Sequence, residues 1–293
     1  MTGRSLCGAA LLACAALFAP ASAWAVLVNC TLSAPAPLDA GVYSGAVRDV
    51  QGNFTINCTR DNNGGDTYYL RVTLAPAPGA ATMSTAFPDT LDYAIYSDVG
   101  RTTLWPANPG ETSIRLTGNA PGGSATMTAY LRVPAGQTGK ASGDYAGSLT
   151  ATLEQLSAAG GAVIRTFAPT ATLASLANVA KACSFGTPPS YLLSYTAFQA
   201  LALTDFTQVV TMNCTKGTGY TLSLDQTSAV VPTVDLRYLL VFSSSGGASI
   251  TAPAGPGGAA SHGLSLTLPA GQAGTCLAPP CSGTGVRTVT VSF

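Results

Sequence analysis

Charged side chains are scarce in this sequence. Lys, Arg, Asp and Glu make up 9% of the 293 residues, and 13 basic residues balance 13 acidic ones. Proteins that bind nucleic acid or anionic lipid usually present a basic patch. The composition therefore favours no nucleic-acid partner and no electrostatic attachment to a membrane surface.

Histidine is rarer still, because His262 is the only one in the chain. A Ser-His-Asp triad or a histidine-based metal site would depend on this single residue, which lies between a Gly-rich segment and a candidate strand. The carboxylates are scattered, and no pair suggests glycoside hydrolysis. We expect no cofactor, no metal and no catalytic residue, with a secreted enzyme as the remaining alternative.

The helix-favouring residues Glu, Lys and Gln are also few, and no apolar repeat of 3.6 residues persists along the chain. Gly, Thr, Ala and Ser are abundant instead. Apolar and polar residues alternate in several segments, for example Leu149, Ala151 and Leu153 with Thr150 and Thr152 between them. Such alternation is typical of half-buried strands, so we predict an all-β protein.

Long apolar runs are absent after the first residues. Arg4 precedes the apolar residues 6–18, and Ala23-Trp24-Ala25 fits a cleavage site, so residues 1–25 are typical of a secretory signal peptide. No later run approaches the ~20 residues of a membrane span. Without this segment, which holds two of the eight cysteines, 8 − 2 = 6 cysteines remain. We predict an exported protein that is soluble or assembled at the surface.

The rest of the chain consists of two similar copies. The segment VPAGQ at 133–137 returns as LPAGQ at 268–272, and an alternating strand comes after each of them. Internal repeats of this length indicate repeated domains. We predict two domains, residues 26–177 and residues 178–293.

The cysteines repeat with the copies. Cys30 and Cys58 are 28 positions apart, and Cys183 and Cys214 are 31 positions apart at equivalent places. Six cysteines allow 15 pairings, so the repeat itself favours Cys30–Cys58 and Cys183–Cys214. Cys276 and Cys281 share one Pro-Pro loop, and we predict that they pair with each other.

Both copies resemble the spore coat U domain of archaic, Csu-type chaperone-usher pilus subunits of Gram-negative bacteria. Residues 91–105 (LDYAIYSDVGRTTLW) and 131–145 (LRVPAGQTGKASGDY) carry the resemblance in the first copy. Residues 183–186, 213–224 and 268–272 carry it in the second, which lacks the Trp-containing loop. The resemblance implies two immunoglobulin-like β-sandwiches and the role of a pilus tip adhesin at the cell surface.

Apolar loops of the first copy are candidates for surface contact. In an immunoglobulin-like order, residues 60–66, 104–106 and 156–161 would share one end of the domain, and exposed apolar loop tips favour interaction with a partner. The target would be an apolar surface or an unknown host ligand. The candidate residues are Leu104, Trp105, Pro106, Leu156, Ala158 and Ala159.

The copies differ in the length of chain after their last shared strand. Residues 162–173 of the first copy are long enough to return as a further strand, with Phe167, Ala171 and Leu173 in phase, whereas the second copy stops at Phe293. The second domain would then lack its final strand, with an acceptor edge at Val289, Val291 and Phe293. An open strand edge must be covered.

The resemblance implies how such an edge is covered. A periplasmic chaperone, an outer-membrane usher and an adjacent pilin subunit would act in turn, with the pilin donating the missing strand. A shaft subunit also needs an N-terminal extension of about a dozen residues, and residues 26–29 are too few to supply it, which favours the tip. A minor pilin away from the tip and a structural coat protein remain the alternatives of the same fold.

Overall fold

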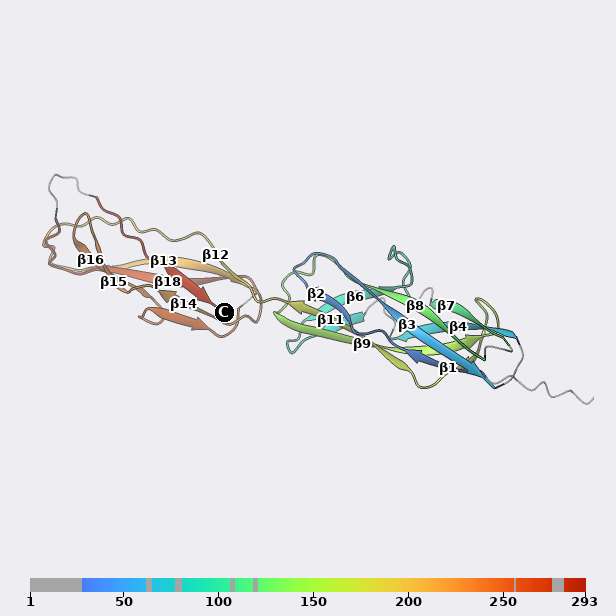
Figure 1. The fold of residues 1–293 in the computed structure, drawn as a ribbon. Coiled ribbons are helices and arrows are strands. Elements are labelled where there is room, and N and C mark those ends of the chain that lie inside the picture. Colours follow the sequence, from blue (N-terminus) through green and yellow to red (C-terminus); the bar gives the residue numbers. More distant parts are fainter. Residues whose placement is uncertain are drawn as a thin grey trace, which may run out of the picture.

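The computed structural model describes residues 28–61, 65–76, 81–105, 109–117, 121–255, 257–275 and 282–293. All regular secondary structure in these ranges is β-strand, which confirms the all-β prediction, and they contain no helix that could span a membrane. Figure 1 shows two immunoglobulin-like sandwiches that lie end to end. We call β1–β11 the first domain and β12–β19 the second domain.

The first domain has two layers. One has the strand order β1-β3-β8-β6-β5 and the other β7-β4-β9-β11-β2, and β10 pairs with the end of β9. The strands are β1 (Val28–Ser33), β2 (Leu38–Val42), β3 (Arg48–Arg60), β4 (Asp66–Ala75), β5 (Ala81–Ser84), β6 (Thr90–Tyr96), β7 (Gly110–Leu116), β8 (Gly122–Val133), β9 (Gly143–Leu156), β10 (Val163–Thr166) and β11 (Ala171–Val179).

The second domain repeats this order with fewer strands. Its layers are β12-β13-β18-β16-β15 and β17-β14-β19. The strands are β12 (Cys183–Phe185), β13 (Leu203–Cys214), β14 (Tyr220–Leu224), β15 (Ser228–Val231), β16 (Leu236–Phe242), β17 (Ser249–Ala252), β18 (Ala259–Leu268) and β19 (Val289–Ser292). The first layer matches β1-β3-β8-β6-β5 strand for strand, and the second matches β7-β4-β9. Among the described strands of this domain, none takes the place of β11 or β2.

Alternating burial builds each core as the sequence predicts. Along β4 the inward residues Tyr68, Leu70, Val72 and Leu74 are buried between polar neighbours, and Tyr220, Leu222 and Leu224 of β14 repeat this pattern. The outward residues of these strands, mostly Thr, Ser and Arg, face water. Each domain therefore has its own apolar core.

Strand β11 completes the first domain. It pairs antiparallel with β9 from Ala171 opposite Ala151 to Val179 opposite Gly143, and it pairs in parallel with β2 on its other edge. The predicted return strand is thus confirmed, although it lies further along the chain than the residues that suggested it. It reaches Val179, two residues past the domain boundary that the sequence suggested, and only residues 180–182 separate it from β12.

The two domains contact each other through one turn. Residues 215–218, which come directly after Cys214, meet the base of the first domain, where Lys216 Nζ lies 2.7 Å from Asp89 Oδ1. The Ser142 N–H donates to the Lys216 carbonyl at 2.8 Å, and the buried Thr218 and Ser142 hydroxyls lie 3.1 Å apart. The ion pair with Lys216 lowers the pKa of Asp89. Backbone and side chains together fix the joint.

Candidate functional site: the far end of the first domain and the open edge of the second

Two of the three predicted disulfides are present among the described residues. Cys30 is bonded to Cys58 across the β1–β3 ladder, and Cys183 is bonded to Cys214 across the β12–β13 ladder. Each bond ties the first strand of its domain to the second strand in the sheet. Cys276 and Cys281 lie outside the described residues.

Trp105 is a core residue, which corrects the expectation of an exposed contact. Its side chain is 1% exposed, its ring centroid lies 6.0 Å from that of Phe54, and its indole Nε1–H donates to the Val72 carbonyl at 2.9 Å. The backbone N–H of Trp105 also bonds to the Ile95 carbonyl. The loop is therefore drawn inward, and the tryptophan closes the sandwich.

The turn before Trp105 explains why the chain bends inward there. The Asp98 carboxylate accepts the backbone N–H groups of Thr102 and Thr103 at 3.0 and 2.6 Å, and these bonds lower its pKa. Leu104 is 36% exposed and pairs with Tyr96, which is level with Gln51 near the start of β3 and therefore far from Arg60 at the other end of that strand. The Leu104 segment therefore does not share the far end with the other two loops, contrary to expectation. Pro106 lies outside the described residues.

A polar hollow of about 420 Å³ opens above Trp105. Its floor includes Met127, and its walls carry the hydroxyls of Ser97, Thr103, Thr126 and Thr128 with the carboxylates of Asp98 and Glu111. Those carboxylates already accept hydrogen bonds from backbone N–H groups of Thr103 and Gly160. The hollow is a surface feature of the tryptophan loop.

The far end of the first domain carries an apolar hairpin between β9 and β10. Leu156 is 2% exposed, which corrects the expectation of an exposed residue, although it lies outside the main core cluster. Ala158 and Ala159 are exposed as expected. Val163 and Ile164 are also exposed, at 41% and 60%, although their position at the start of the predicted return strand did not mark them as candidates. We call residues 157–164 the apolar hairpin.

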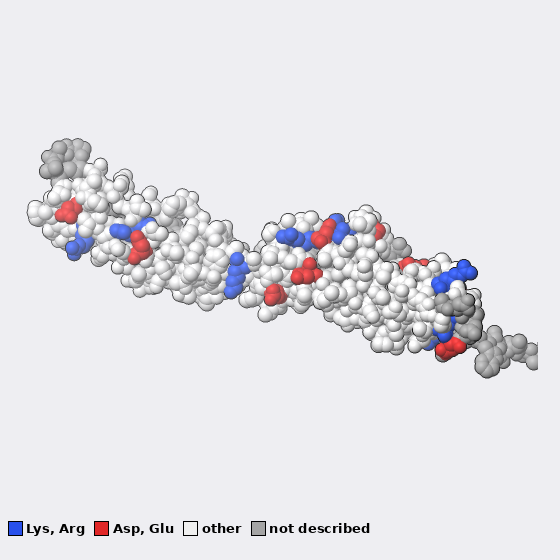
Figure 2. All heavy atoms as spheres, in the orientation of Figure 1, with Lys and Arg blue, Asp and Glu red and all other residues white. Residues whose placement is uncertain are grey.

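Charged side chains lie in small separate groups on the face shown in Figure 2, and most of that face is uncharged. One such group joins β3, β8 and the loop before Trp105. Asp49 binds Arg132 through two bonds of 2.8 Å, and Arg101 lies 3.3 Å from the same carboxylate. The hydrogen bonds from Arg132, with the charge of Arg101, hold the pKa of Asp49 below its ordinary value of 3.8.

This ion group predicts acid sensitivity. A carboxylate whose pKa is lowered by folding stabilises the native state above its unfolded pKa, and this contribution is lost as pH falls through the folded pKa. We expect the urea midpoint of the wild type to fall more than that of Asp49→Asn between about pH 5 and about pH 2.5. Equal falls in both proteins would show that the Asp49 carboxylate adds nothing to the free energy of unfolding. Many exposed ion pairs add no measurable stability.

Strand β9 pairs with β11 on the side that faces away from β4, whereas no described strand pairs with the corresponding side of β19. In the first domain Leu149 and Ala151, which pair with β11, and Leu153, the next inward residue, are at most 2% exposed. By their pairing with β14, Val289 of the second domain matches Leu153 and Val291 matches the half-buried Gln155. Both valines are only half-buried, and residues 282–288 before them form no strand. Among the described strands only β14 pairs with β19, so the other side of this short strand has no strand partner there, and its role as an acceptor edge stays a prediction.

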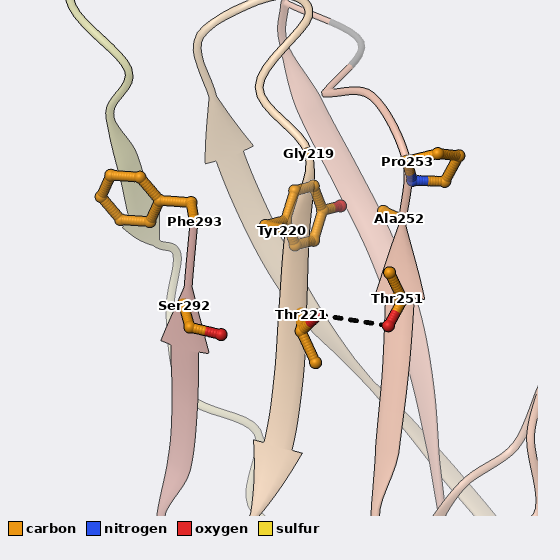
Figure 3. A pocket seen from close by; sticks show the side chains of 8 residues that line it. All are labelled: Gly219, Tyr220, Thr221, Thr251, Ala252, Pro253, Ser292 and Phe293. Atoms are coloured by element: carbon orange, nitrogen blue, oxygen red, sulfur yellow. Dashed lines mark hydrogen bonds between the residues drawn. The ribbon is translucent and has the colours of Figure 1, made fainter.

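Phe293 marks the free side of this edge. Its side chain is 55% exposed, and Figure 3 shows its ring on the side of β19 that faces away from β14. It borders a shallow hollow of about 430 Å³ that is also lined by Tyr220, Thr221 and Ser292. A neighbouring strand would meet this ring first.

The opposite wall of the open space is an extended segment. Tyr191, Leu193 and Tyr195 alternate toward the core, and the Tyr195 hydroxyl donates to the Gln272 carbonyl at 2.8 Å. In the first domain Tyr43 at the end of β2 bonds similarly to the Pro134 carbonyl, and its N–H donates to Asn178 of β11. The second domain thus retains both walls that hold β11 in the first.

The lone histidine is part of the fold. His262 lies within β18, and its Nε2 is 2.6 Å from the Tyr220 hydroxyl. Burial lowers the pKa of His262 and raises that of Tyr220. In the residues that the structure describes, no group of three or more His, Cys, Asp or Glu side chains is arranged to hold a metal ion.

Comparison with known families places a domain on the first copy. Residues 16–152 match the family described as Spore Coat Protein U domain. The match spans 152 − 15 = 137 of 293 residues and ends before the second copy. A comparison with curated proteins found no match.

Several solved structures match this chain over most of their own length at low sequence identity. A chain in the CsuC-CsuE chaperone-tip adhesion subunit pre-assembly complex of Acinetobacter baumannii is 16% identical, with a TM-score of 0.45 over 90% of this chain and 100% of that chain. The CupB6 tip adhesin of Pseudomonas aeruginosa is 13% identical, with a TM-score of 0.41 over 91% and 96%. AggA, a major fimbrial subunit from Escherichia coli, is 19% identical, with a TM-score of 0.22 over 53% and 95%.

Proposed function

We propose, from the premise that residues 16–152 carry a Spore Coat Protein U domain, that this chain is the tip adhesin of an archaic chaperone-usher pilus. The first domain attaches the cell to surfaces and supports biofilm formation, and the second domain joins the fibre. The observation that carries the proposal is the difference between the two domains: β11 pairs with β9, while no described strand pairs with the side of β19 that faces away from β14.

The second domain is the acceptor in this proposal. Its edge at Val289, Val291 and Phe293 receives a strand, first from a periplasmic chaperone and then from the adjacent pilin subunit at the outer-membrane usher. The protein is thereby exported through the periplasm to the surface of a Gram-negative cell. A free edge between apolar walls aggregates unless a partner covers it, which explains why a chaperone is required.

The first domain offers the apolar hairpin as its contact surface. Ala158, Ala159, Val163 and Ile164 are exposed together in the hairpin that joins β9 to β10. Covering about 200 Å² of apolar area would contribute roughly 5 kcal/mol at ~25 cal/mol per Å², and association costs consume much of this. One tip then binds weakly and many pili bind firmly.

Attachment of piliated cells to polystyrene tests this proposal. We expect Ala159→Asp with Ile164→Asp to reduce attachment about tenfold or more, because charge removes the apolar contact while the core is untouched. The control is Val99→Asp, which places one such charge on a 71% exposed valine of the Trp105 loop, and it is compared with Ile164→Asp alone as well as with the double variant. Pilus number, counted by electron microscopy, should not change.

The alternative of a minor pilin or coat protein predicts other results. Attachment would then be unaffected by the hairpin changes, and immunogold labelling would find the protein along the shaft or on the cell body. Labelling confined to fibre ends, with loss of attachment, supports the tip. A fibre-end label with unchanged attachment would keep the tip position and reject the hairpin as its contact.

A further inference from the structure

An arginine lies in the core-facing row of the open edge. Arg287, Val289 and Val291 share one phase and are half-buried, while the residues between them are exposed. The Thr288 carbonyl accepts the Asp225 N–H, so the ladder with the β14 side continues to this point. Arg287 therefore extends the inward row of β19 by one position.

The side chain of Arg287 is held over the rim of the core. Its Nε donates to the Tyr238 hydroxyl at 3.0 Å, and its guanidinium carbon lies 5.7 Å from the centroid of that ring. Its Nη1 lies 3.4 Å from Asp225, whose side chain is 38% exposed. These contacts engage two of the five N–H groups that a guanidinium carries.

The first domain shows what normally occupies this position. In the first domain Val72 of β4 pairs with Leu153, and in the second domain Leu224 of β14 pairs with Val289. Val289 is therefore equivalent to Leu153. Two residues earlier in each strand, Arg287 is equivalent to Ala151. Ala151 is completely buried, and its partner on the covering strand is Ala171. A strand that covers the edge of β19 in the same way meets a cation where β11 meets a methyl group.

We propose that Arg287 selects the strand that joins the second domain, and that this strand carries a carboxylate opposite Arg287 within an otherwise apolar inward row. The inference rests on the proposed function. The inference adds a chemical requirement to the proposed function, because a strand with only apolar inward residues would leave the Arg287 guanidinium without a carboxylate partner on that strand.

The requirement results from the effect of burial on charge. A covering strand removes water from the guanidinium, and a buried cation is tolerated only with a close partner. Asp225 remains at the rim at 3.4 Å and is shared with solvent. A carboxylate on the added strand supplies short charge-assisted hydrogen bonds to the remaining N–H groups of Arg287. A lysine at the same position of the strand is repelled by the guanidinium. Arg287 therefore favours strands with a carboxylate and disfavours strands with a cation.

Synthetic peptides that are present while the full chain refolds from urea test the inference, because the uncovered edge of β19 is expected to aggregate. The probe is a fluorescent peptide with the sequence of residues 168–182, which contains β11. Two forms change the inward residue, Ala171→Glu and Ala171→Lys. A third form, Thr172→Glu, places the same negative charge on the outward face and serves as the control. We expect the first to bind the full chain at least tenfold more tightly than the second by fluorescence anisotropy. The Thr172→Glu peptide should bind less tightly than the Ala171→Glu peptide.

Variants of the protein assign the effect to one residue. Arg287→Glu should reverse the order of the two Ala171 peptides, and Arg287→Gln should remove the preference while retaining the length of the side chain. The inference is overturned if both peptides bind the wild type equally, or if the preference survives in Arg287→Gln. If no peptide binds the wild type, strand addition itself fails, and the proposed function loses its main support together with this inference.

Discussion

Replacing Trp105 with alanine is expected to destabilise the first domain by about 3 to 5 kcal/mol. The side chain is 1% exposed, lies against Phe54 and donates its indole N–H to Val72 in the core. Truncation leaves a cavity and removes the partner of a buried carbonyl, and the two losses add. Urea unfolding of residues 26–182, which include β11, measures the effect.

The matched control is the neighbouring leucine. Leu104→Ala removes an apolar side chain that is 36% exposed, so we expect a loss of about 0.5 kcal/mol. If instead Trp105→Ala leaves the unfolding midpoint unchanged and abolishes attachment to polystyrene, the tryptophan acts at the surface. The inward position of this loop in solution would then have to be rejected.

The strands and disulfides are predictable from the sequence because they obey short-range rules. Alternation over residues such as Leu149 to Leu153 gives the phase of a strand, and equivalent spacing of Cys30–Cys58 and Cys183–Cys214 gives the pairing. The repeat adds the order of strands, since each landmark occurs twice. These signals depend on neighbours in the chain, which the sequence displays directly.

The burial of Trp105 and Leu156 is not predictable in the same way. Trp105 is pulled inward by a turn that Asp98 holds and by an acceptor on β4, which is distant in sequence. The ladder between β4 and β9 runs without a shift to Leu156, which therefore lies on the face opposite to Leu149, Ala151 and Leu153, yet it is 2% exposed. Periodicity predicts the face on which a residue lies, but not what covers that face.

Arg287 shows how a charged residue can be overlooked in an alternating strand. Its position in phase with Val289 and Val291 is visible in the sequence alone. An alternating row predicts an apolar inward face, and a charge at its end resembles an ordinary surface residue. Only the structure shows its contacts with Tyr238 and Asp225, which approach from a different strand and a turn.

Residues 180–293, expressed alone in the periplasm, are expected to be insoluble or degraded. Val289 and Val291 are only half-buried and one side of β19 is unpaired among the described strands, so apolar side chains and backbone groups face water together. A strand the size of β11 would cover about 300 Å² of apolar surface, or roughly 7 kcal/mol at ~25 cal/mol per Å². That is comparable to the whole stability of a small domain, about 5 to 15 kcal/mol.

Adding the missing strand to the same chain should reverse this result. A copy of residues 169–181 appended after Phe293 through an Asn-Gly turn can run back antiparallel to β19, as β11 runs along β9. Because the strand is tethered, its effective concentration is in the millimolar range, and we expect a soluble monomer with a cooperative urea transition.

The control carries Leu173→Asp and Ala177→Asp in the appended copy, since both match buried residues of β11, and it should remain insoluble. If residues 180–293 without any added strand prove monomeric and unfold cooperatively, the edge of β19 needs no partner, and the second domain cannot be an acceptor.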